Sequence, residues 1–185
     1  KAHTGVFASH YDEGRMARIV DPRSEWSITA KRSIARFGDL ERRSGISFFT
    51  PVGYLGLGGP GLQYNDACAT AGATQGATLR RLDAAQIRTA FPFLNVPDDA
   101  DGLIETGSAG YISPRGLVAA QTALAAEGGA ALLRDVADTL RTMSGGIEIA
   151  TMGGDTVIAE KVIVATGAFT QAWGLTQKNL NLKVY

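Results

Sequence analysis

The sequence predicts an α/β chain with α+β character. Two segments place apolar residues at helical spacing between residues that start and stop helices. Several short runs have strand character, and the near-continuous apolar run 161–166 is typical of a strand covered on both faces. Together these patterns favour a sheet with a parallel component.

The first predicted helix covers 22–44, with Pro22 near its start and Gly45 after its end. The basic cluster Lys31 to Arg43 is predicted to form its solvent-exposed face. Its apolar positions are Trp26, Ala30, Ile34, Phe37 and Leu40.

Short strands are predicted next, and then a region without clear periodicity. The strands are 46–49 and 53–58. The Gly-, Ala- and Thr-rich region 59–78 is expected to be a loop or a segment whose partner lies elsewhere. A short helix from Leu82, with Asp83 as a first-turn acid or cap, should stop at Pro92.

The second long helix follows two further strand candidates, 102–105 and 110–113. Ser113 is its predicted cap, Pro114 its first residue and Gly128 its left-handed end. Its apolar face is Leu117, Ala120 and Leu124.

A β-rich region completes the pattern. The predicted strands are 131–136, 147–151, 156–160 and 161–166, and the turn Gly153–Gly154–Asp155 joins the second to the third.

The composition excludes several classes of protein. Apolar residues make up 45% and charged residues 19%, so the chain can bury a core. The net charge of zero argues against a nucleic-acid partner or binding to an anionic membrane, and no apolar run is long enough for a membrane span. Cys68, the one cysteine, is expected to be a small buried residue and excludes a disulfide framework. A reducing, cytoplasmic location and no metal site are expected.

Three motifs have two readings each. Residues 56–61, GLGGPG, match the dinucleotide pattern G-x-G-x-x-G, but no apolar helical stripe follows, which favours a glycine-rich hairpin end. The run 162–169, VIVATGAF, is either a strand that ends at a ligand or a core strand with a glycine stop.

In 7–18, FASHYDEGRMAR, Arg15 and Arg18 are either anion-binding or surface arginines. They share a face in a helix and point opposite ways in a strand.

The ordered set of motifs resembles the FAD-dependent oxidoreductases of the D-amino acid oxidase superfamily, most closely the sarcosine oxidase-like branch. The matching residues are the Ser-His and Arg-x-x-Arg of 9–18, the Phe-Pro helix end at 91–92, the GYISPRG helix start, LLRDV and KVIVATGAF. The upstream pyrophosphate-binding unit of the family is absent, and both ends look cut, so we expect a fragment that is inactive alone.

The resemblance implies parts of two domains. Residues 1–45 and 111–175 would belong to a Rossmann-like FAD/NAD(P)-binding domain, 46–110 to a mixed-sheet substrate domain, and 176–185 to the return to that domain. The partners would be FAD and a small amine or amino acid whose C–N bond is oxidised. The oligomeric state is left open.

The resemblance also implies roles for single residues. Arg15 and Arg18 would be catalytic, with Arg15 beside the flavin ring and Arg18 on the substrate carboxylate. Ser9 and His10 would lie by the pyrophosphate. The adenine–ribose side would be lined by Val136, Ala165, Thr166 and Gly167. An oxidase, a dehydrogenase with another electron acceptor, and a non-catalytic module without flavin all remain open.

Overall fold

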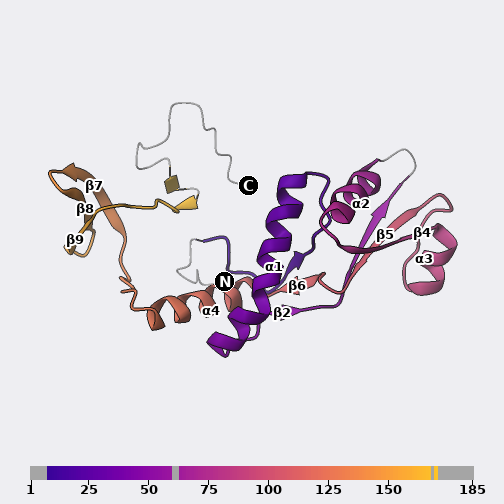
Figure 1. Cartoon of the computed structure of the whole chain (residues 1–185), viewed down its shortest axis with the longest axis horizontal. Coiled ribbons are helices and arrows are strands. Elements are labelled where there is room, and N and C mark those ends of the chain that lie inside the picture. The colour runs from indigo at the N-terminus through magenta and orange to yellow at the C-terminus, as the bar shows by residue number, and fades with distance from the viewer. Residues whose placement is uncertain (1–7, 60–62, 168, 171–185) are drawn as a thin grey trace. The chain divides into compact units, whose positions relative to one another are not determined.

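The computed structural model describes residues 8–59, 63–167 and 169–170. The chain forms two compact units, 1–130 and 131–185, which we describe separately (Figure 1). The first contains β1 (Arg15–Ala17), α1 (Ser24–Ser44), β2 (Phe49–Thr50), β3 (Tyr54–Gly58), α2 (Tyr64–Thr74), β4 (Thr78–Leu82), α3 (Ala84–Ala90), β5 (Asp101–Thr106), β6 (Gly110–Ile112) and α4 (Pro114–Glu127). The second contains β7 (Ala137–Met143), β8 (Gly146–Thr151) and β9 (Thr156–Ala159).

One sheet of the first unit has the order β1-β6-β2 and packs with α1 and α4. Its apolar cluster contains Ala17, Phe37, Phe48 and Ala120, and the rings of Phe37 and Phe48 meet edge to face at 5.3 Å. Gly45 ends α1 at φ 70°, and its N–H donates to the Glu41 carbonyl. These contacts hold β1, and with it the arginine-rich segment, against the two long helices.

The other sheet of the first unit has the order β3-β5-β4. Consecutive strand residues face opposite sides of a sheet. Accordingly, Leu103 of β5 packs with Cys68 of α2, whereas Ile104 packs with Ile87 of α3. The two helices therefore cover opposite faces.

The second unit has a sheet of order β7-β8-β9, joined by two tight turns. Gly145 and Gly154 adopt φ of 97° and 94°, a region that glycine enters without steric cost. The predicted turn at Gly153–Asp155 is confirmed.

The local helix signals are confirmed. The side chain of Ser113 accepts from Gly116 N, Pro114 begins α4, and Asp83 forms a capping box with Gln86. One detail is wrong: Gly128 has φ −74°, and the left-handed residue is Gly129 at φ 89°.

The predicted loop 59–78 is wrong, because most of it forms α2 and the start of β4. Small residues make the contact face of α2. A Cβ on Gly72 would lie 2.7 Å from Val20 Cγ1. Cys68 is 1% exposed, which confirms the prediction that it is buried. The lack of an apolar stripe therefore reflects close packing and not the absence of a helix.

Two predicted strands are also absent from the described residues. Residues 131–136 and 161–166 have no strand partner there, and Leu132 and Ile163 are 63% and 92% exposed. A strand needs a neighbour to pair with its backbone. All described strand pairs are antiparallel, so the predicted parallel component is not seen among them.

The mixed α/β class is confirmed. The division at 45, 110 and 175 stays a prediction, since the two compact units are defined by packing and not by cofactor or substrate contact. None of the helices in the described ranges is long and apolar enough to span a membrane.

Candidate active site

Arg18 directly follows β1 and carries a partly buried guanidinium, with the side chain 18% exposed. Its Cζ lies over the Tyr54 ring, 5.0 Å from the centroid. Its Nη2 donates to the Tyr64 hydroxyl at 3.4 Å and lies 3.6 Å from Asp21 Oδ2. Its Nη1 is buried, and no acceptor in the described part of the chain reaches it.

The surroundings keep Arg18 charged and keep Tyr54 and Cys68 neutral. Burial opposes protonation of Arg18, but Tyr54, Tyr64 and Asp21 outweigh it, so its pKa lies above the usual value. Burial raises the pKa of Tyr54 and of Cys68. At neutral pH the site therefore presents one cation beside a phenol and a thiol.

A buried carboxylate holds the backbone next to Arg18. Glu105, on β5, is 0% exposed. Its Oε2 accepts from the N–H groups of Ile19 and Val20, each at 2.9 Å, while its Oε1 lies 3.0 Å from Ile19 N and accepts from the Ser108 hydroxyl at 3.3 Å. These bonds satisfy two buried backbone donors that no strand partner reaches among the described pairs.

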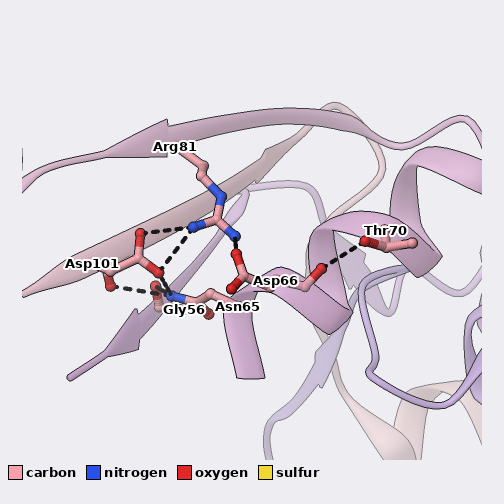
Figure 2. A network of polar contacts seen from close by, with 6 residues as sticks. All are labelled: Gly56, Asn65, Asp66, Thr70, Arg81 and Asp101. Carbon is pink, nitrogen blue, oxygen red and sulfur yellow. Dashed lines mark hydrogen bonds and ion pairs between the residues drawn. The ribbon is translucent and has the colours of Figure 1, made fainter. Parts of the chain in front are cut away.

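A second network holds α2, which brings Tyr64 to Arg18. Figure 2 shows Arg81 between Asp66 and Asp101, paired with both carboxylates. Asn65, 1% exposed, donates to the Asp101 carbonyl at 3.1 Å and to its carboxylate at 3.0 Å. The start of α2 is thus bound to β4 and β5.

This packing also explains the glycines of GLGGPG. A Cβ on Gly56 would lie 3.0 Å from the Tyr54 hydroxyl and 3.2 Å from Asn65 Oδ1, and one on Gly58 would lie 3.1 Å from Asn65 Nδ2. Its residues Gly56 to Gly58 lie on β3, which pairs antiparallel with β5, unlike the parallel strand of a dinucleotide fingerprint. The described part of the motif therefore makes room for Asn65.

A cleft of about 320 Å³ lies beside Arg18. Its lining includes Met16, Arg18, Asp21, Trp26, Phe37 and Ile112. Trp26 is 56% exposed and contributes to this cleft, not to the core. An apolar pocket with one cation and one carboxylate fits a small molecule that has both an ammonium and a carboxylate group.

Arg15 is placed differently. It lies on β1, opposite Ile112 of β6, and donates from Nε to Asp12 at 2.7 Å. It does not line the cleft, whereas Met16 and Arg18 do. Of the two arginines, Arg18 therefore lines the cleft and Arg15 does not.

Ser9 and His10 lie in a turn at the start of the described chain, with Ser9 exposed and His10 partly buried. The loop that follows contacts the first turn of α4. Arg115 lies over the Tyr11 ring at 4.8 Å and forms an ion pair with Glu13.

The other predicted cofactor residues belong to the second unit. The side chain of Val136 is exposed, while its N–H donates to Asp135 at 2.7 Å and its carbonyl accepts from Met152 N. Only the Val136 side chain is therefore open to an adenine ring.

The segment Ala165–Gly167 leads into a tight turn. The Thr166 carbonyl accepts from Phe169 N at 3.0 Å, and the Gly167 carbonyl accepts from the Thr170 hydroxyl at 2.7 Å. Gly167 has φ 54° and open space at its Cβ position.

The sequence matches the family described as FAD dependent oxidoreductase, DAO, over residues 1–185. The chain belongs to this family. The predicted resemblance to the FAD-dependent D-amino acid oxidase superfamily is therefore confirmed. No curated protein matches the sequence.

Solved structures of amino acid oxidases share the fold. NikD, an unusual amino acid oxidase essential for nikkomycin biosynthesis, is 24% identical with a TM-score of 0.70, and the match covers 88% of this chain and 42% of NikD. Glycine oxidase from Geobacillus kaustophilus is 24% identical with a TM-score of 0.68, and the match covers 86% of this chain and 45% of that enzyme. Iminodiacetate oxidase from Chelativorans sp. BNC1 is 26% identical with a TM-score of 0.61, and the match covers 83% of this chain and 43% of that enzyme. The chain spans less than half the length of these proteins.

Sequence reasoning missed Tyr54, Tyr64 and Glu105. The strand candidate GLIE contains Glu105, but an acid at a strand end is usually exposed. The signal would have been the two consecutive apolar residues before it, Leu103 and Ile104, since apolar neighbours on opposite faces indicate a strand buried on both faces.

Proposed function

We propose that the protein is a sarcosine oxidase-like enzyme that oxidises the C–N bond of an amino acid or N-methyl amine. FAD, when bound, supplies the chemistry by accepting a hydride from the carbon next to nitrogen. The observation that carries the proposal is the placement of Arg18, which lines an apolar cleft and has a partly buried guanidinium whose Nη1 finds no acceptor among the described residues.

Arg18 binds the substrate carboxylate in this proposal. A guanidinium offers a planar fork of donors that matches two carboxylate oxygens. Tyr54 and Tyr64 contact the guanidinium without neutralising its charge. The Asp21 carboxylate, on the same cleft and 3.6 Å from Arg18 Nη2, supports an ammonium group close to the bound carboxylate.

The cofactor residues keep their expected roles as part of the proposal. Ser9, His10 and Arg15 hold the flavin and pyrophosphate side, with Arg15 stabilising negative charge on the ring. Val136, Ala165, Thr166 and Gly167 hold the adenosine side. A buried lone cysteine supports a reducing, cytoplasmic location.

The test uses the full-length FAD-loaded protein, identified by its flavin absorbance. Glycine, sarcosine, L-proline and D-alanine are compared with their carboxamides. Arg18→Ala should raise KM for the carboxylates by roughly ten- to a hundredfold, because a hydrogen-bonded charge pair contributes about 1.5–3 kcal/mol. The carboxamides should respond little.

Arg36→Ala is the matched control, since Arg36 is an exposed arginine with the side chain 66% accessible. It should leave every KM unchanged. Equal carboxylate preference in Arg18→Ala and the parent protein would refute the assignment. Release of peroxide supports an oxidase, and turnover only with an added dye supports a dehydrogenase.

A further inference from the structure

We infer that Glu105 is a positioning residue for substrate recognition, acting through the backbone that follows Arg18. This inference rests on the proposed function, in which Arg18 binds a carboxylate. Glu105 does not touch the cleft. Its carboxylate is 0% exposed and receives the N–H groups of Ile19 and Val20 across 86 and 85 residues of sequence.

The bonds to Glu105 take the place of a strand partner. The β1–β6 pairing ends at Ala17, so the two amides beyond it have no ladder partner in the described sheet. Ile19 and Val20 are 6% and 0% exposed, so water does not reach them readily. An ionised carboxylate is the strong acceptor that such buried donors need.

Ile19 and Val20 directly follow Arg18, so their hydrogen bonds to Glu105 affect where Arg18 is held. Arg18 lies between β1 on one side and the anchored amides on the other. Its side chain is long and flexible, and its hydrogen bond to the Tyr64 hydroxyl is long, at 3.4 Å. The direction of the guanidinium therefore depends on where the backbone is held, and a misplacement of about 1 Å can cost a large factor in recognition.

The chain contains a matched control for a purely structural role. Glu41, on α1, likewise accepts two consecutive backbone N–H groups, those of Phe48 and Phe49, at 2.6 and 2.9 Å. It anchors the start of β2 and lies far along the sequence from Arg18. Loss of this anchor should lower stability without changing carboxylate recognition.

The experiment compares two series in the FAD-loaded protein, Glu105→Gln and Glu105→Met against Glu41→Gln and Glu41→Met. Glutamine keeps one acceptor oxygen and methionine keeps none. The readouts are KM and kcat for sarcosine and glycine, KM for their carboxamides, and thermal midpoint. Binding of acetate and of acetamide, followed by flavin absorbance, gives a readout without turnover.

We expect carboxylate KM to rise about tenfold or more in Glu105→Met and less in Glu105→Gln, with kcat and carboxamide KM changing little. Acetate affinity should fall in the same order. Adding either Glu105 substitution to Arg18→Ala should remove no further carboxylate preference, because Glu105 acts only through the Arg18 contact. The Glu41 variants should lose thermal stability only.

Two outcomes separate the inference from the proposed function. If Arg18→Ala loses carboxylate preference while both Glu105 variants keep it, Glu105 is merely structural and the inference fails. If Arg18→Ala itself keeps the preference, the proposed function fails. Where the methionine variant does not fold, the glutamine variant decides by the same comparison.

Discussion

The guanidinium of Arg18 lies over the ring of Tyr54, with 5.0 Å between Cζ and the ring centroid. The two residues come from different sheets of the first unit, β1-β6-β2 and β3-β5-β4. Their contact links the arginine-rich segment to the sheet that carries Glu105. It also makes the cation's position sensitive to changes in either sheet.

The Tyr54 ring should contribute to carboxylate binding through the cation. Tyr54→Leu removes a cation–π contact of about 0.5–2 kcal/mol and should raise carboxylate KM several-fold. Tyr54→Phe keeps the ring and should leave KM near the parent value. Equal KM changes in both variants would show that the hydroxyl, not the ring, matters.

Two helical glycines should respond oppositely to alanine. Gly72→Ala places a Cβ 2.7 Å from Val20 Cγ1 and should destabilise the protein by about 1–3 kcal/mol through overpacking. Gly38→Ala, in α1, meets nothing within 4 Å and should stabilise by roughly 0.8–1 kcal/mol. Urea unfolding of both variants gives the two values, and a stable Gly72→Ala protein would contradict the tight α2 contact.

Stability should fall in alkaline solution partly because of Cys68. Burial raises the pKa of the folded thiol above its ordinary value of 9.0. The unfolded state therefore loses its proton first, and stability present below about pH 9 declines as the pH rises. Unfolding free energies at pH 7 to 10 should decline less steeply in Cys68→Ala than in the parent protein. Identical slopes would argue against the shifted pKa.

Accessibility of the same thiol gives an independent check. Cys68 is 1% exposed, so N-ethylmaleimide at pH 7.5 should label the folded protein slowly and the urea-unfolded protein fast. Mass spectrometry follows the reaction. Rapid labelling of the folded protein would show that α2 opens readily.

The buried amide of Asn65 should matter more than the ion pairs around it. Asn65→Leu leaves the Asp101 carbonyl and carboxylate without a buried donor and should cost about 1–3 kcal/mol. Arg81→Met removes pairs whose arginine is 44% exposed and should cost less than about 1 kcal/mol. Thermal unfolding of the two variants measures both losses of stability. A larger loss in Arg81→Met than in Asn65→Leu would contradict the prediction.

The sequence by itself determined the features that depend on neighbouring residues. The end of α1 at Gly45, the start of α4, the Asp83 capping box and the turn at Gly153–Asp155 follow from residues that bond or bend their own backbone. The exposed basic face of α1 likewise follows from the pattern of charges. These interactions span only a few residues, so the local pattern contains them.

Tertiary structure decided the rest. It made α2 a helix from small residues that fit closely on Val20, and it selected Arg18 over Arg15 as the arginine that lines the cleft. It also buried Glu105 against amides 86 residues away. Such choices depend on which distant segments meet and on whether a backbone donor finds a partner, and no local pattern of residues encodes that meeting.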